Sequence, residues 1–304
     1  MESTAERRAE TREFDLGTQR VERTVAVIGI GRVGLPLALF LADHGHTVYG
    51  IDKNEGYLRF LKDERRLPFK EEGAQELLEE HLERRFFPMS DLSQVAQCDV
   101  IIVTIGTPID QHMNPVLAPV EEVIRELSPH LRKGQLIVLR STVSPGTTEF
   151  LQSSLQRRTR LEIGRDLFLA FCPERIAQGF SIRELGEIPQ IVGGVDAAST
   201  EQAAAFFGGL GIQVHPTDAV SAELSKLFCN MYRYIDFAIA NEFMMIASEY
   251  QRNIYEIVRM VNTGYKRGGI KLPGLTGGPC LYKDGFFLPV SYTHLRAHET
   301  KANL

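Results

Sequence analysis

The chain lacks any excess of basic residues, and this limits the partners it can have. Its 304 residues carry a formal net charge of −5, so we expect neither nucleic acid nor an anionic membrane surface among its ligands. The sequence also lacks an apolar run of the roughly 18–20 residues that a membrane-spanning helix needs. Its N-terminus is charged throughout, without the apolar stretch of a signal peptide. We therefore expect a cytoplasmic protein in which residues 1–23 form a solvated tail.

Cysteine is scarce, and its spacing excludes two kinds of site. The four cysteines lie far apart and show no CxxC pair: Cys98, Cys172, Cys229 and Cys280. This argues against a zinc site and against a disulfide framework. We expect free thiols in a reducing compartment and no bound metal.

The stretch GGPCLYKD places Cys280 on a glycine-rich loop with polar neighbours. A thiol becomes a good nucleophile when nearby positive charge lowers its pKa. Lys283, or Lys226 from elsewhere in the fold, can supply that charge. A buried, inert thiol is the ordinary alternative, and it is the one we expect for Cys98 and Cys229.

Strand and helix patterns alternate through the first two thirds of the chain. Strands are expected at residues 25–30, 47–51, 98–108, 134–142, 167–174 and 189–194, with helices that include residues 35–41 and 199–211. This alternation implies right-handed crossovers and a mainly parallel sheet with helices on both faces. The expected fold class is α/β, with a doubly wound, Rossmann-type sheet over residues 24–217.

The composition changes near residue 218, after which neither proline nor glycine occurs until Gly264. Apolar residues recur there at helical spacing, and a helix of about 32 residues would run roughly 48 Å. Such a helix is too long for one small domain to bury, so we expect it to bridge domains or subunits. We predict a helical central domain over residues 218–288. Residues 289–304 have no apolar period, and we interpret them as non-native.

The motif GIGRVG follows the first strand and opens a helix, and an acid follows the next strand. Its three glycines allow a tight turn, close approach of a pyrophosphate and close helix–strand packing, while a carboxylate accepts the ribose hydroxyls. The carboxylate repels a 2′-phosphate, which favours NAD over NADP. The alternative is a glycine-rich turn with an incidental aspartate. The residues expected to contact the cofactor here are Gly29, Gly31, Arg32, Val33, Gly34 and Asp52.

Further polar residues follow other strands, on the side where ligands of open parallel sheets bind. Thr107 ends IGTP and is placed near the nicotinamide half of the cofactor. Thr142 ends a strand in RSTVSPGTT, just before a capped helix start, and Glu174 follows a strand in CPERIAQG. Lys226 and Asn230 are four residues apart, so they share one helical face and suit a hydroxyl and a developing oxyanion. Each residue also has a purely structural reading: a turn, a helix cap, a surface glutamate or a solvated lysine.

Taken in order, these segments resemble the UDP-glucose/GDP-mannose dehydrogenase family, the NAD-dependent nucleotide-sugar 6-dehydrogenases. The resemblance spans about residues 24–288 through GIGRVGLP, GTP, STVSPGTT, CPERIAQG, AELSKLFCNMYRYIDFAIANE and GGPCLYKD. It implies a UDP-sugar substrate, a homodimer formed through the long helix, and oxidation of a CH2OH group to a carboxylate with two NAD per turnover.

The resemblance also implies roles for single residues. Cys280 adds to the aldehyde as a thiohemiacetal, because an aldehyde by itself has no tetrahedral carbon that carries both hydride and oxyanion. Lys226 and Asn230 hold the oxyanion. Asp284 positions water and supports base chemistry. Glu174 activates the hydrolytic water, and Thr142 orders the water network.

The sequence departs from the UDP-glucose branch of the family at one motif. Arg175 follows Glu174, and Gln178 stands where that branch has a second acid. This resembles the branch that acts on UDP-N-acetyl-D-mannosamine and related N-acetylated sugars, with UDP-glucose 6-dehydrogenase as the alternative. The family continues into a C-terminal domain that this chain does not reach, so we expect it to bind NAD but to oxidise sugar poorly.

Two readings from other classes remain open. A β-hydroxyacid or 6-phosphogluconate dehydrogenase shares the Rossmann domain, the long helix and the Lys-x-x-x-Asn pair, but it performs a single two-electron oxidation without a thiol. A fragment that binds NAD or dimerises without turnover is the non-enzymatic alternative. Cys280 discriminates between the first of these and the nucleotide-sugar reading.

Overall fold

The computed structural model describes residues 21–275 and 281–288. Its centre is an eight-stranded sheet in the order β3-β2-β1-β4-β5-β6-β7-β8. The first six strands run parallel, and β7 and β8 run in the opposite direction. The strands are β1 (Thr24–Ile28), β2 (Thr47–Ile51), β3 (Phe86–Met89), β4 (Val100–Val103), β5 (Gln135–Leu139), β6 (Leu167–Phe171), β7 (Gln190–Gly194) and β8 (Val214–Asp218).

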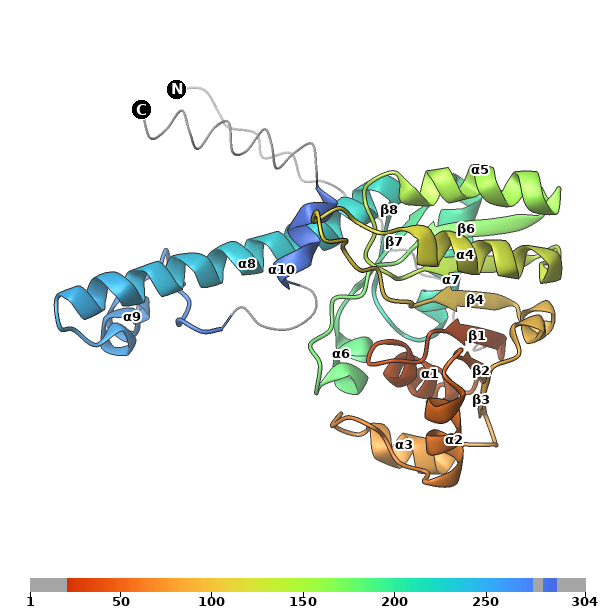
Figure 1. The fold of residues 1–304 in the computed structure, drawn as a ribbon, viewed down its shortest axis with the longest axis horizontal. Helices are drawn as coiled ribbons and strands as arrows, with labels where there is room; N and C mark the ends of the chain where they lie inside the picture. The colour runs from red at the N-terminus through yellow and green to blue at the C-terminus, as the bar shows by residue number, and fades with distance from the viewer. Residues whose placement is uncertain (1–20, 276–280, 289–304) are drawn as a thin grey trace, which may run out of the picture.

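Helices cover both faces of this sheet (Figure 1). Val25 and Val27 of β1 point into one core with α1, α2, α3, α6 and α7, while Ala26 and Ile28 point into the other with α4 and α5. This alternation is the two-residue period of a strand buried on both sides. The helices are α1 (Gly34–Asp43), α2 (Glu55–Asp63), α3 (Ala74–His81), α4 (Ala118–Leu127), α5 (Thr147–Thr159), α6 (Ser181–Glu187), α7 (Ala197–Gly209), α8 (Ala219–Glu249), α9 (Ile254–Asn262) and α10 (Leu281–Asp284).

The doubly wound α/β fold expected from the sequence is confirmed, with informative differences at the strand ends. The predicted strands overran β4, β5 and β6, which end at Val103, Leu139 and Phe171. The residues that follow leave the ladder and form the site described below. Two edge strands were not predicted. Each carries a proline (Pro88 in β3 and Pro216 in β8), a residue that sheets tolerate mainly at their edges and that disguises a strand in the sequence.

The long helix is α8, 31 residues from Ala219 to Glu249, which corresponds to about 46 Å. Its N-cap is Asp218, whose side chain accepts the N–H of Ser221 at 2.8 Å. The helix begins against the sheet and then runs clear of it, with α9 folded back on its far end (Figure 1). The short α10 packs against α8 near the sheet. Across residues 21–275 and 281–288, none of the helices, α8 included, is both long and apolar enough to cross a bilayer.

The cysteines differ in their surroundings. Cys98 and Cys172 are buried, and burial raises the pKa of each thiol to about 12. Cys98 is therefore inert, as expected. The expectation for Cys229 was wrong: it is exposed on α8, because helical spacing shows which residues share a face but not whether another element covers that face. Cys280 lies outside the described residues, as do residues 1–20 and 289–304.

Candidate active site

The glycine-rich turn joins β1 to α1, and its three glycines differ in backbone conformation and in the space around them. Gly29 has φ +88°, a left-handed conformation that favours glycine. A Cβ on Gly34 would lie only 2.1 Å from the carbonyl oxygen of Gly29, so helix and turn could not pack as they do. The Cβ position of Gly31, in contrast, has no atom within 4 Å. The turn thus leaves an open approach at Gly31, in front of the N-terminus of α1, where anions bind well.

Asp52 stands beside this turn, directly after β2. The N–H of Gly29 donates to the carbonyl of Ile51 at 2.8 Å, which ties the two strand ends together. The carboxylate of Asp52 accepts the N–H of Asn54 at 2.9 Å, and Asn54 is the N-cap of α2. A half-buried acid next to an open glycine turn fits the ribose and pyrophosphate of a dinucleotide.

Arg32 and Val33, the other two residues of the turn, differ in exposure. Val33 is half-buried and immediately precedes α1, whereas Arg32 is exposed. The guanidinium of Arg32 donates to Oε1 of Gln178 at 3.3 Å. This contact joins the glycine turn to the loop that follows β6, so the expected cofactor and sugar motifs lie next to each other.

Thr107 and Thr142 also meet, although 35 residues separate them. The hydroxyl of the buried Thr107 donates to the main-chain carbonyl of Thr142 at 2.7 Å. Each threonine follows one of the adjacent strands β4 and β5, and the bond joins the two loops. Thr142 itself is half-buried. The structure therefore places both residues at the carboxyl edge of the sheet, close to the glycine turn on β1.

The carboxylate of Glu174 is held in a buried ion pair with Arg140. Arg140 Nε and Nη2 lie 3.0 and 2.7 Å from Oε2 of Glu174, and Nη1 donates to Oε1 of Gln190 at 2.8 Å. The side chains of Arg140 and Glu174 are only 2% and 8% exposed. The main-chain N–H of Ile176 donates to the other oxygen, Oε1. The loop after β6 is thus fixed to β5 and β7 by charge-assisted bonds.

Our reading of the sequence missed Arg140 and Gln190. One signal was present for Arg140: it directly follows Gln135–Leu139, a strand in which every residue is buried. A cation in such a place needs a counterion, because an unpaired buried charge is very costly. Gln190 gave no comparable signal, since its role depends on β7 lying next to the loop after β6.

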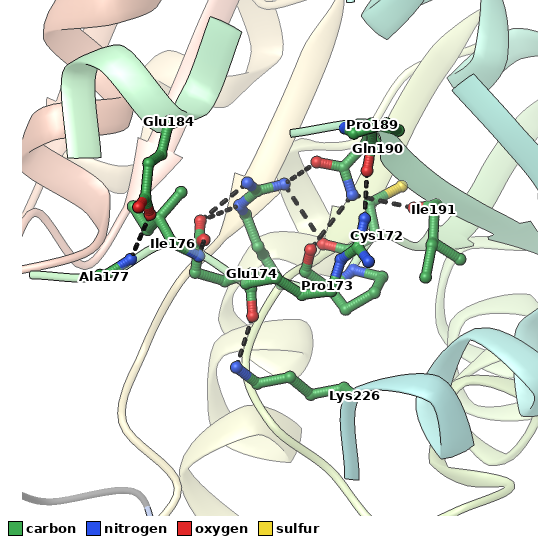
Figure 2. Close-up of polar contacts among 12 residues, drawn as sticks. Cys172, Pro173, Glu174, Ile176, Ala177, Glu184, Pro189, Gln190, Ile191 and Lys226 are labelled. Atoms are coloured by element: carbon green, nitrogen blue, oxygen red, sulfur yellow. Dashed lines mark hydrogen bonds and ion pairs between the residues drawn. The ribbon is translucent and has the colours of Figure 1, made fainter. Parts of the chain in front are cut away.

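Lys226 reaches the same loop from α8. Its ammonium donates to the main-chain carbonyl of Glu174 (Figure 2). Two residues singled out separately in the sequence are therefore neighbours in space, joined through the backbone of one and the side chain of the other. The contact brings a positive charge to the carboxyl edge of the sheet.

Asn230 lies one helical turn beyond Lys226 and meets the C-terminal motif. Its side-chain amide donates to Oδ2 of Asp284, which has no solvent exposure. Lys283 Nζ lies 3.0 Å from Oδ1 of the same carboxylate. Asp284 ends α10, which begins one residue after Cys280. The thiol itself lies outside the described residues, so its place in the site stays a prediction.

The structure thus brings four of the six expected catalytic residues into two contacting pairs along one face of α8. Glu174 meets Lys226, and Asn230 meets Asp284. Thr142 lies at the end of a neighbouring strand. The arrangement combines a dinucleotide-type turn, a lysine ammonium and buried carboxylates, which are the groups that hydride removal from an alcohol and stabilisation of an oxyanion require.

Comparison with known proteins identifies the family. The NAD binding domain of the UDP-glucose/GDP-mannose dehydrogenase family matches residues 23–209, and the family's central domain matches residues 220–302. The UDP-N-acetyl-D-mannosamine dehydrogenase of Pyrococcus horikoshii is 31% identical over 275 residues, 87% of this chain and 63% of the relative. An NDP-N-acetyl-D-galactosaminuronic acid dehydrogenase of Ralstonia nicotianae is 32% identical over 278 residues, 88% of this chain and 64% of the relative.

Solved structures agree with these matches. The structure of the UDP-D-ManNAc dehydrogenase of Pyrococcus horikoshii superposes with a TM-score of 0.83 at 31% identity, covering 87% of this chain and 63% of that one. The chain thus spans less than two thirds of the length of these relatives. The match to the NAD binding domain confirms NAD as the cofactor that the fold implies, and Gly29, Gly31, Gly34 and Asp52 fit it. The chain belongs to the UDP-glucose/GDP-mannose dehydrogenase family.

Proposed function

We propose that the protein oxidises the C6 hydroxymethyl group of a UDP-N-acetylated hexosamine, UDP-N-acetyl-D-mannosamine foremost, to the uronate. The observation that carries the proposal is the row of contacts along α8, where Lys226 and Asn230 meet Glu174 and Asp284. The names of the relatives support an N-acetylated sugar, since the two described above act on N-acetyl-mannosamine and N-acetyl-galactosaminuronic acid derivatives. The CPER form of the motif at Glu174 supports the same choice over UDP-glucose.

When bound, NAD accepts the hydride in each of the two oxidation steps. The chain's own residues would hold it: the turn at Gly29–Gly34 would receive the pyrophosphate, Asp52 would accept the ribose hydroxyls, and Thr107 would stand beside the nicotinamide half. Asp284, acting through a water molecule that it would position, takes the proton of the C6 hydroxyl in the first step. The ammonium of Lys226 and the amide of Asn230 stabilise the negative charge that develops on that oxygen.

The second step requires a covalent adduct, which we assign to Cys280. Its thiolate adds to the aldehyde carbon, and the carbonyl electron pair moves to oxygen as a thiohemiacetal oxyanion. Loss of the second hydride re-forms the carbonyl as a thioester. Water then attacks the thioester, the carbon–sulfur bond breaks, and the products are the carboxylate and the free thiol.

Glu174 is the proposed base for that water, and its contacts leave room for the role. Oε2 is taken by Arg140, while the only protein donor to Oε1 among the described residues is the N–H of Ile176. A carboxylate oxygen has two lone pairs, so Oε1 retains one for water. Thr142, at the end of the neighbouring strand, orders the water network.

We also propose that two copies of the chain associate through what we call the apolar arm, the part of α8 and α9 beyond Asn230. Association through the arm would use the helical central domain, which we assign to residues 218–288, and leave the NAD-binding domain, residues 24–217, outside the interface. A groove of about 450 Å³ between α8 and α9 is lined mainly by apolar side chains, among them Phe243, Ile246, Tyr250, Ile254, Ile257 and Ile270, with Arg252 as its one charged residue. The exposed large apolar side chains of the arm include Tyr232, Ile235, Ile239, Phe243, Met244, Met245, Ile246, Tyr255 and Met260. Patches of this kind mark association surfaces.

A direct test follows NADH formation with UDP-N-acetyl-D-mannosamine, UDP-N-acetyl-D-glucosamine and UDP-glucose side by side. We expect the two N-acetylated sugars, and UDP-N-acetyl-D-mannosamine in particular, to give the higher kcat/KM. Cys280→Ala is expected to abolish formation of the uronate while NAD binding stays unchanged. Full conversion to the acid by Cys280→Ala would overturn the thioester scheme and favour a two-electron dehydrogenase.

A further inference from the structure

Two side-chain hydroxyls grip successive carbonyl groups of the glycine turn. The hydroxyl of Tyr57, on α2, donates to the main-chain oxygen of Ile30 at 2.7 Å. The hydroxyl of Thr104, directly after β4, lies 2.8 Å from the main-chain oxygen of Gly29 and 3.0 Å from that of Ile28. The Ile28 oxygen already accepts the N–H of Thr104, so Gly29 is the acceptor that depends on the hydroxyl. The two side chains come from opposite sides of β1, because β2 leads into α2 and β4 is the other neighbour of β1. The turn is therefore held from both flanks.

These bonds set the direction of the N–H groups that follow. In a trans peptide the carbonyl and the next N–H point in opposite directions within one plane. The bond from Tyr57 therefore fixes the N–H of Gly31, and the bond from Thr104 fixes the N–H of Ile30. Successive N–H groups aimed outward from a turn form an anion-binding concavity, and Gly31 is the position whose surroundings are open.

The same bonds keep partial negative charge away from the ligand. A carbonyl oxygen that turned toward a pyrophosphate would repel it, and each of these two oxygens is instead occupied by a donor inside the protein. Burial and the nearby charge of Asp52 raise the pKa of Tyr57, so its phenol stays a donor across the physiological range. The main-chain N–H of Tyr57 donates to the side chain of Asn54, and the main-chain N–H of Asn54 donates to the carboxylate of Asp52. One hydrogen-bonded chain thus runs from the ribose acid to the pyrophosphate turn.

We propose that Tyr57 and Thr104 are positioning residues for the cofactor, which orient the peptide planes of the glycine turn so that its N–H groups receive the pyrophosphate. Neither residue needs to touch the ligand for this role. The inference rests on the proposed function through its dinucleotide site, and it predicts that the two hydroxyls matter for ligands that contain the pyrophosphate and not for those that lack it.

The test measures dissociation constants by calorimetry at fixed ionic strength for NAD, ADP-ribose and adenosine. We expect Tyr57→Phe to weaken NAD and ADP-ribose about three- to tenfold, the effect of one lost hydrogen bond, and adenosine less than twofold. Thr104→Val should behave in the same way, and Thr104→Ser, which keeps the hydroxyl, should recover most of the affinity. Tyr265→Phe removes a hydroxyl from an exposed side chain beyond α9 and serves as the control.

The outcomes separate the inference from the function on which it rests. Unchanged NAD affinity in both Tyr57→Phe and Thr104→Val would overturn the inference alone. An equal loss for adenosine would also overturn it, because the hydroxyls would then act through Asp52 and α2. Failure of the wild-type chain to bind NAD would overturn the proposed function and the inference with it. Thermal melts of each variant show whether the fold is intact.

Discussion

The sheet and the apolar arm differ in how far their apolar side chains are buried. In β1, β4 and β5 nearly every residue is buried by helices of the same chain, and the charges that enter this region, such as Arg140 and Glu174, are paired. In the arm, Tyr232 is 66% exposed and Met245 is 60% exposed. The helices that cover the sheet all belong to this chain, whereas the arm presents apolar surface that no described part of the chain covers. Lys226, Asn230, Glu174 and Asp284 lie where the two regions meet.

This difference shows which region each kind of perturbation should affect. The side chains at the carboxyl edge of the sheet are buried and paired within one chain. Substitutions there should therefore change folding stability and cofactor binding. Changes on the arm alter a surface that nothing in the described chain covers, so they should appear in association. The following experiments test this separation, beginning with the largest effect.

Removing the buried cation should destabilise the sheet most. We expect Arg140→Met to lower the free energy of unfolding by about 3–5 kcal/mol, because it leaves the Glu174 carboxylate buried without its partner. The double variant Arg140→Met/Glu174→Met should recover much of that loss, since no charge is then stranded. Denaturant titration measures both, with the exposed Arg32→Met as the control. If Arg140→Met were as stable as wild type, the conclusion that the buried Glu174 carboxylate depends on Arg140 would be wrong.

Two glycines of the turn should separate folding from binding. Gly34→Ala forces a methyl group against the carbonyl of Gly29, and we expect a loss of roughly 1–3 kcal/mol in stability. Gly31→Ala meets no atom within 4 Å and has no left-handed backbone to strain, so its stability should change by less than about 0.5 kcal/mol. Its NAD affinity should nevertheless fall, because the methyl group occupies the approach to the turn. Calorimetry measures the NAD affinity of both variants. Wild-type NAD affinity in Gly31→Ala would argue against binding of the cofactor at the open side of Gly31.

A charge on the arm should disrupt association and leave folding largely intact. Ile239 is 46% exposed, so we expect Ile239→Glu to change the unfolding free energy of the monomer by less than about 0.5 kcal/mol. The same variant should shift the protein from dimer to monomer in light scattering coupled to size exclusion. Gln202→Glu, an exposed change on α7, is the matched control and should remain dimeric. A wild-type chain that is monomeric at high concentration would refute the assignment of the arm.

The smallest effect concerns Glu223, a fully buried residue of α8 that caps the start of α5. Its carboxyl accepts the N–H groups of Gly146 and Thr148, and burial raises its pKa above the ordinary value of 4.5. The folded state therefore holds this proton more tightly than the unfolded state. The resulting stability is fully present below pH 4.5 and is lost as the pH rises through the raised pKa.

Comparison with Glu223→Gln isolates this contribution from those of the other carboxyl groups. We expect the free energy of the variant relative to wild type to improve as the pH rises from 5 to 7, by less than about 1 kcal/mol. Urea titrations across that range measure it. A difference between the two proteins that does not vary with pH would show that Glu223 has the same pKa in both states.

The sequence predicted those features that depend on local pattern. Apolar strands, the long helix and the glycine turn follow from periodicity and from glycine geometry, and the residues at the strand ends were picked out because parallel strands share one ligand-binding edge. Arg140, Gln190 and Tyr57 were missed because their partners are distant in sequence. Cys229 was misplaced because periodicity cannot say which face of a helix is covered. The edge strands were hidden by their prolines.

The number of NADH molecules formed per UDP-sugar consumed tests the central claim most directly. It is best measured in a single turnover, with the protein in excess over UDP-N-acetyl-D-mannosamine and NAD at saturation. The thioester scheme predicts two NADH for each sugar converted, with the uronate as the only product. One NADH per sugar, with an aldehyde or ketone as the product, would contradict it.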